Sequence, residues 1–108
     1  MSMVRACGVA DVPSGSSLAV EVDGVDVAVA HDGDEWYAIY DECSHAAIPL
    51  SEGEVEGCEI ECWLHGSRFD LRTGKPTGLP ATEPVTIYPV SVEGDSVLVD
   101  VRNPVSSP

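Results

Sequence analysis

Two cysteine–histidine pairs dominate the chemistry that this sequence could support. Cys43 and His45 are separated by one residue, and Cys62 and His65 form a second pair further along the chain. Each pair joins one thiolate to one imidazole, and both groups are common ligands of iron and zinc. The spacing therefore predicts a single metal centre that is gripped by two loops, with one pair on each loop.

Two kinds of centre fit a donor set of two cysteines and two histidines. In a 2Fe–2S cluster, neutral imidazoles in place of two thiolates remove negative charge, so the cluster is easier to reduce. A tetrahedral zinc site can use the same four donors. Zinc fingers, however, usually place their two cysteines close together and their two histidines close together. The mixed pairs favour the iron–sulfur cluster, and zinc is the alternative.

The elements that must position these pairs are short strands. Apolar runs that suit strands lie at 18–22, 25–29, 36–40, 85–92 and 97–101. The Asp23-Gly24 pair between the first two runs is a strong local signal for a hairpin. No segment has the length and period of a helix, although a single helical turn could form near 46–50. The pattern predicts an all-β protein.

Both ligand pairs follow strand-like segments. Cys43 comes shortly after the run at 36–40, and Cys62 directly follows residues 55–61. Because the apolar alternation in 55–61 is imperfect, we expect a β-bulge near Gly57-Cys58. Residues 75–84 are rich in proline, which predicts a stiff loop.

The charge distribution limits the partners that the chain can have. The 108 residues suit one domain, and the formal net charge is −14. Between Arg5 and Arg68 there is no lysine or arginine. Such a surface repels nucleic acids and anionic membranes. The acidity either attracts a basic partner surface or serves only solubility.

The sequence also predicts where the protein is found in the cell and how exposed its remaining cysteines and histidine are. The chain lacks the roughly 20 consecutive apolar residues that cross a bilayer, and it lacks a secretory signal. We therefore expect a soluble intracellular protein in which Cys7 and Cys58 are partly buried free thiols. His31 is expected at the surface, and Trp36, Tyr37 and Tyr40 are expected to pack in a strand.

The segments around the two pairs resemble a known family. Cys43-Ser44-His45 and the run from Cys62 to Ser67 resemble the Rieske signature. Residues 65–74, together with 78–81 and 83–85, resemble the soluble Rieske ferredoxins of bacterial aromatic-ring-hydroxylating dioxygenases. The resemblance covers nearly the whole chain. It implies a Rieske fold of stacked antiparallel sheets in one domain, 1–108, with a small cluster-binding part at about 41–84.

The resemblance also implies a role for each site residue. Cys43 and Cys62 would bind the inner iron of one 2Fe–2S cluster, and His45 and His65 would bind the outer iron near the surface. Ser67 would donate a hydrogen bond to a cluster sulfide.

The resemblance also assigns positions near the cluster to two further residues. Pro80 would cover the cluster from a third loop. Trp63, between the ligands, would shield the cluster, lie at the docking face or pack in the core.

Departures from the respiratory Rieske proteins sharpen this expectation. Those proteins carry an extra cysteine in each cluster loop, and the two form a disulfide. Ile48 and Leu64 stand at the matching positions here. A tyrosine that donates to a ligand sulfur in the respiratory type is replaced by Phe69. Fewer hydrogen bonds to sulfur stabilise the reduced cluster less, which predicts a low-potential centre.

The function implied by the resemblance is electron transfer without catalysis by this chain. The protein would carry single electrons from a ferredoxin reductase to a terminal oxygenase, as a monomer in the bacterial cytoplasm. Carbazole, biphenyl and benzene dioxygenases use carriers of this kind. Two alternatives stay open: a zinc-binding interaction domain, and a permanent electron-transfer subunit of a larger oxidoreductase.

Overall fold

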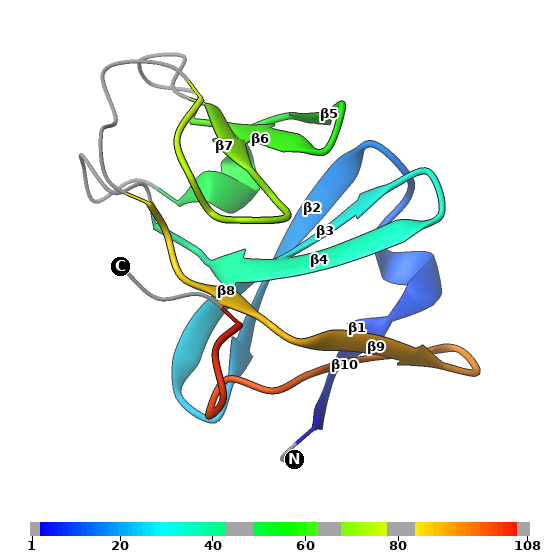
Figure 1. Cartoon of the computed structure of the whole chain (residues 1–108). Coiled ribbons are helices and arrows are strands. Elements are labelled where there is room, and N and C mark those ends of the chain that lie inside the picture. Colours follow the sequence, from blue (N-terminus) through cyan, green and yellow to red (C-terminus); the bar gives the residue numbers. More distant parts are fainter. Residues whose placement is uncertain (1–2, 43–48, 63–67, 78–83, 106–108) are drawn as a thin grey trace.

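The computed structural model describes residues 3–42, 49–62, 68–77 and 84–105. These residues form three antiparallel sheets that lie one above another (Figure 1). We call them the basal sheet (β1-β10-β9), the central sheet (β2-β3-β4-β8) and the small sheet (β5-β6-β7). The all-β prediction is confirmed. Within the described residues, no helix has the length and apolar character needed to span a membrane.

The strands have the following bounds. The basal sheet contains β1 (Val4–Gly8), β9 (Val90–Glu93) and β10 (Ser96–Val99). The central sheet contains β2 (Ser16–Val22), β3 (Val25–Asp32), β4 (Glu35–Tyr40) and β8 (Ile87–Tyr88). The small sheet contains β5 (Val55–Glu56), β6 (Glu59–Glu61) and β7 (Arg68–Asp70). The 3-10 helices in the described part are η1 (Val9–Asp11) and η2 (Leu50–Glu52).

The predicted hairpins form where turn residues separate the apolar runs. β2 and β3 pair up to Val22 and Val25, so Asp23-Gly24 makes the predicted two-residue turn. The predicted strand at 85–92 is instead divided at Pro89, which has no N–H to donate to a sheet. β8 before this proline pairs with β4, whereas β9 after it pairs with β10.

Strand β3 is buried on both faces and separates two apolar cores. Val27 and Val29 belong to the core between the central and basal sheets, where they pack with residues such as Val97 and Val99. Ala28 and Ala30, on the opposite face, belong to the core between the central and small sheets. Alternation along one strand therefore supplies both cores.

The bulge expected near Gly57-Cys58 is wrong, because these residues form a tight turn. Glu56 pairs with Glu59 and Val55 pairs with Ile60, so residues 55–61 are a hairpin and not one strand. Gly57 and Cys58 have φ values of 60° and 62°, as a two-residue turn of this hand requires. The apolar alternation breaks because Val55 and Ile60 face each other across the turn, where both are buried.

Two aromatic residues of β4 pack against different cores, whereas Tyr40, which was also expected to pack, is 37% exposed. Tyr37 packs against the core under the small sheet, and Trp36 packs against the core next to the basal sheet. His31 is half-buried, not free on the surface: its ring stacks on Trp36 at 4.0 Å between centroids, and its Nδ1 donates to the Val12 carbonyl at 2.8 Å. Of the two spare thiols, Cys7 is buried and Cys58 is half-buried.

The small sheet is an insertion in the central sheet. Its strands lie between β4 and β8 in the sequence. β4 and β8 are themselves neighbours, paired at Ala38 with Tyr88 and at Ile39 with Ile87. The Tyr40 N–H also donates to the Thr86 carbonyl at 2.9 Å. The chain therefore leaves and re-enters the central sheet at adjacent positions (Figure 1).

Candidate metal centre

Cys62 is the predicted ligand that the structure describes. It follows β6 directly, is 0% exposed and is a free thiol. It belongs to the apolar core between the central and small sheets, with Leu50 and Phe69 among its neighbours in that core. A buried thiol at a strand end is suited to bind the inner, protein-covered iron of a cluster, because the strand fixes its backbone.

The other predicted site residues lie outside the described part of the chain. These residues are Cys43, His45, Trp63, Leu64, His65, Ser67 and Pro80. Ile48 also lies outside the described part. They fall in three segments that we name the first (43–48), second (63–67) and third (78–83) ligand segments. The residues that border these segments are described, and their contacts show how the three segments are held.

The first ligand segment is closed by one carboxylate. Asp41 precedes the segment, and Ser51 follows it. The Ser51 N–H donates to Asp41 Oδ1 at 2.7 Å, and the Ser51 hydroxyl donates to Asp41 Oδ2 at 2.7 Å. The residues on either side of the segment are therefore joined by two hydrogen bonds to one carboxyl group.

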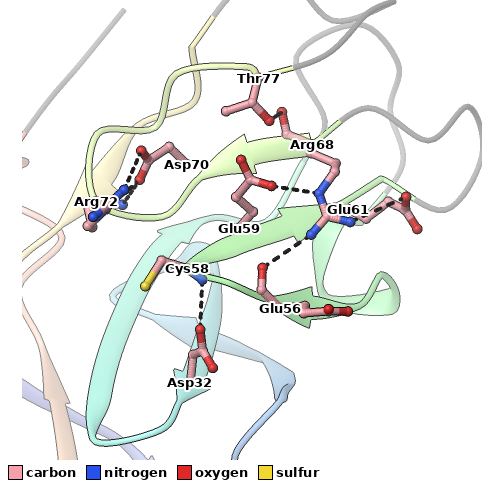
Figure 2. Close-up of polar contacts among 9 residues, drawn as sticks. All are labelled: Asp32, Glu56, Cys58, Glu59, Glu61, Arg68, Asp70, Arg72 and Thr77. Carbon is pink, nitrogen blue, oxygen red and sulfur yellow. Dashed lines mark hydrogen bonds and ion pairs between the residues drawn. The ribbon is translucent and has the colours of Figure 1, made fainter.

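The second ligand segment is closed by the pairing of β6 with β7 and by the Arg68 guanidinium. Glu61 and Arg68 are partners across the two strands. Arg68 Nε donates to Glu59 Oε1 at 2.8 Å, and Arg68 Nη1 lies 3.7 Å from Glu61 Oε2. Arg68 Nη2 also donates to the Glu56 carbonyl at 3.2 Å, so one cation joins three strand positions (Figure 2).

The residues on either side of the third ligand segment contact β7 and the turn that follows it. The Thr77 N–H donates to the Arg68 carbonyl at 2.7 Å, and the Thr77 hydroxyl donates to that carbonyl at 3.3 Å. On the other side of the segment, the Val85 N–H donates to the Gly74 carbonyl at 2.8 Å. Gly74 has a φ of +78°, and a Cβ there would overlap the Val85 carbonyl oxygen. The close approach therefore requires glycine.

A second close approach joins the first segment to the second. A Cβ on Gly53 would overlap the carbonyl of Glu61, the residue before Cys62. The Glu61 N–H donates to the Glu54 carbonyl at 2.9 Å. The exit of the first segment thus packs directly on the entrance to the second. These contacts therefore bring the exit of the first segment, both ends of the second and the start of the third to the small sheet.

The charges around Arg68 shift the ionisation of their partners. The hydrogen bond from Arg68 lowers the pKa of Glu59, and the same bond raises the pKa of Arg68. On the same sheet, the hydrogen bond from Arg72 lowers the pKa of Asp70. Two carboxylates near the ligand segments are therefore held in the ionised form by specific cations.

Cys58 connects the tip of the small sheet to the central sheet. Its N–H donates to Asp32 Oδ2 at 2.7 Å (Figure 2), and its Sγ accepts from the Tyr37 hydroxyl at 3.3 Å. Burial, followed by this hydrogen bond, raises the pKa of Tyr37. These contacts give Cys58 a structural role next to the site.

The donor chemistry fits an iron–sulfur centre. The thiol of Cys62 is buried and forms no disulfide, and β6 and β7 border the second segment on either side. Within the described residues, no group of three or more histidine, cysteine, aspartate or glutamate side chains is arranged to hold a metal ion.

Comparison with known proteins agrees with this geometry. Residues 2–89 match the family described as the Rieske [2Fe-2S] domain. The chain belongs to this family. Its cofactor is one Rieske-type 2Fe–2S cluster, and its role is that of an electron carrier.

Relatives within the family are similar over almost the whole chain. The 3-phenylpropionate/cinnamic acid dioxygenase ferredoxin subunit of Shigella boydii is 46% identical over 102 residues, which cover 94% of this chain and 95% of the relative. The ferredoxin of carbazole 1,9a-dioxygenase from Nocardioides aromaticivorans is 44% identical, with a TM-score of 0.86 over 92% of this chain and 97% of that one.

A third similar structure includes a partner. It is a complex of reduced oxygenase and oxidized ferredoxin in carbazole 1,9a-dioxygenase, and the matched chain is 36% identical with a TM-score of 0.83. The match covers 90% of this chain and 91% of that chain. The likeness is thus to a chain from the structure of a ferredoxin in complex with its oxygenase.

Sequence reasoning missed the residues that close the ligand segments. Asp41 and Ser51 give no motif of their own, since only the fold shows that they meet. Arg68 had a visible signal, because it is the first cation after Arg5 and it directly follows the second ligand segment.

Proposed function

We propose that this protein carries single electrons from a ferredoxin reductase to the terminal oxygenase of an aromatic-ring-hydroxylating dioxygenase. The observation that carries the proposal is the similarity, over nearly the full length, to ferredoxin subunits of such systems. The similarity to a ferredoxin in complex with its oxygenase supports the same acceptor. Catalysis then belongs to the oxygenase, and this chain supplies the electrons.

We assign the cluster ligands to Cys43, His45, Cys62 and His65. The burial of Cys62 and the meeting of the segment ends at the small sheet support this assignment. When bound, the cluster takes up and releases one electron at a time. The assignment makes 1–108 one domain, with a cluster-binding part at about 41–84.

The remaining residues near the cluster have supporting roles in this proposal. Ser67 donates a hydrogen bond to a sulfide, Pro80 covers the cluster, and Trp63 and Leu64 surround it between the second pair of ligands. Each of these roles rests on the match to the family pattern.

We propose a low reduction potential within the Rieske class. Phe69 supports this, because it is fully buried in the core that contains Cys62 and has no hydroxyl to donate to a ligand sulfur. Hydrogen bonds to sulfur stabilise the reduced cluster, so a site with fewer of them is reduced at a lower potential.

The net charge of −14 supports transient docking on basic surfaces. Attraction between opposite charges speeds the encounter and weakens as salt screens it. Electron transfer to the oxygenase should therefore slow as ionic strength rises.

We propose that the protein acts as a monomer in the bacterial cytoplasm, without binding membranes or nucleic acids.

Three measurements on the purified protein test the proposal. Electron paramagnetic resonance of the dithionite-reduced protein should show a 2Fe–2S signal with mixed nitrogen and sulfur ligation, and a colourless zinc protein would refute it. Reconstitution with a reductase and an oxygenase should couple NADH oxidation to product formation. Size-exclusion chromatography in high salt separates a free carrier from a permanent subunit, which would copurify with its enzyme.

A further inference from the structure

The contacts of Asp41 hold the first ligand segment at both ends. The Asp41 carboxylate accepts from the Ser51 N–H and hydroxyl, each at 2.7 Å. Asp41 itself is fixed to the central sheet, because its N–H donates to the Asp26 carbonyl at 3.0 Å. Ser51 is fixed as well, since its carbonyl accepts from the Ser17 hydroxyl at 2.9 Å. The carboxylate thus joins two points that are both anchored in the sheet.

The neighbours of Asp41 and Ser51 connect this carboxylate to the ligands. Asp41 lies two residues before Cys43, and Ser51 follows Leu50 in η2. Leu50 is 0% exposed and belongs to the same apolar core as Cys62. A change in the Asp41–Ser51 contact would therefore move the described residues on either side of the first ligand pair relative to the core that holds the Cys62 thiol.

We propose that Asp41 is a positioning residue, whose carboxylate holds the segment with Cys43 and His45 in the shape that accepts the cluster. The proposal rests on the ligand assignment made above. Asp41 acts through Ser51 and does not bind iron. A closed segment loses less conformational freedom when the cluster binds, and this favours retention of the cluster.

Three variants separate the contact from the charge. Asp41→Ala removes both hydrogen bonds. Ser51→Ala removes the hydroxyl bond but leaves the charge and the bond from the Ser51 N–H. Asp41→Asn removes the charge, yet its oxygen can accept from the Ser51 N–H and its amide nitrogen can donate to the Ser51 hydroxyl.

Asp11→Ala is the matched control. Asp11 is the last residue of the exposed 3-10 helix η1, and its carboxylate accepts from the Gly8 N–H at the end of β1 at 2.9 Å. This variant removes one negative charge, as Asp41→Ala does, together with one hydrogen bond from a backbone N–H to the carboxylate. It leaves the contacts of the small sheet unchanged.

The experiment measures cluster release and cluster geometry in the holoprotein. Release of iron to a ferrous-ion chelator is followed by absorbance, and the reduced protein is examined by electron paramagnetic resonance. Asp41→Ala should release iron about tenfold faster or more, and Ser51→Ala a few-fold faster, because each lost bond loosens the segment. Asp41→Asn and Asp11→Ala should stay within about twofold of wild type. The resonance of Asp41→Ala should be broadened, because the cluster environment is less uniform.

Several outcomes would overturn the proposal. Equal release rates and equal spectra for Asp41→Ala and Asp11→Ala would remove the positioning role. Release from Asp41→Asn as fast as from Asp41→Ala would assign the effect to charge. If Asp41→Ala does not fold, Ser51→Ala decides, and a wild-type rate there refutes the inference. A wild-type protein without a mixed-ligand cluster would instead refute the proposed function, and this inference with it.

Discussion

The two ends of the molecule are held together in different ways. Among the described residues, nine buried ones form a core of mostly aliphatic side chains between the basal and central sheets, where β2 and β3 have 7 and 8 residues. In the small sheet, β5, β6 and β7 have two or three residues each. There, charged side chains such as Arg68 and close backbone approaches such as Gly53 join the strands.

This difference indicates which forces maintain each end. Long strands with a shared apolar core gain their stability from burial, which does not depend on a cofactor. Strands of two or three residues form only short hydrogen-bond ladders, so the small sheet relies more on side-chain contacts with what surrounds it, including the core that contains Phe69. The small sheet should therefore depend on the cluster, whereas the other two sheets should stay folded without it. Substitutions can test each half of this contrast.

Loss of a ligand should have the largest effect. Cys62→Ser should abolish stoichiometric iron binding, because a serine hydroxyl at this buried position is a poor ligand for iron. Amide hydrogen exchange should then rise in β5 to β7 and stay slow in β2 and β3. Cys58→Ser is the control, since this thiol lies in the same hairpin but outside the ligand set, and it should retain iron. Uniformly fast exchange would show that both ends depend on the cluster.

Phe69→Ala should give the next largest effect. Phe69 is the largest side chain among those that are fully buried, and it lies in the core that contains Cys62. Truncation of a buried phenylalanine costs about 3–5 kcal/mol of unfolding free energy. Denaturant unfolding measures the loss, and iron release should accelerate in parallel.

Val99→Ala is the matched change in the other core. It should lower the unfolding free energy but leave the paramagnetic resonance spectrum as in wild type. An altered spectrum in this variant would mean that the two cores are not independent.

Gly53→Ala should have an intermediate effect. A methyl group there overlaps the Glu61 carbonyl, so the exit of the first ligand segment must move away from the entrance to the second. Overpacking of this kind costs about 1–3 kcal/mol. Thermal unfolding and iron content report the result. Gly24→Ala, where a Cβ would meet no atom within 4 Å, serves as the control for conformational strain alone, because its φ is +80°.

Arg68→Gln should have the smallest effect at neutral pH. The side chains of Arg68 and Glu59 are 32% and 30% exposed, and pairs of this kind contribute about 0.2–1 kcal/mol. The folded-state pKa of Glu59 is lowered by Arg68. The stabilisation is therefore present above the ordinary glutamate pKa of about 4.3 and is lost as pH falls through the lower folded value.

The pH dependence distinguishes the pair from general destabilisation. Wild type should lose stability below about pH 4 more steeply than Arg68→Gln does, since the variant has already lost the pair. Glu59→Gln should show the same flattened profile. Parallel profiles for all three proteins would contradict a role for this ion pair.

Local signals predicted much of the two larger sheets. Asp23-Gly24 identified the β2–β3 hairpin, because turn chemistry and alternation act over a few residues. The division of the last apolar run at Pro89 was missed, although proline gave the physical reason. Which sheet each half joins depends on partners far away in the sequence, namely β4 and β10.

The small sheet was harder to predict for the same reason. Residues 55–61 looked like one bulged strand, since a turn at Gly57-Cys58 with a cysteine in the left-handed region is unusual. The ligand pairs were recognisable as a motif because metal chemistry restricts residue types. In the sequence nothing distinguishes Asp41 from the other acidic residues, because only the fold brings Ser51 to its carboxylate.

The adjacency of β4 and β8 has a consequence for how this architecture can be altered. The chain crosses from one strand to its neighbour by way of the whole ligand-bearing insertion. A short reverse turn could span the same gap, because the Tyr40 N–H already reaches the Thr86 carbonyl at 2.9 Å. The ligand-bearing part therefore enters the central sheet at a single site, and we expect its replacement by such a turn to leave a smaller, colourless protein.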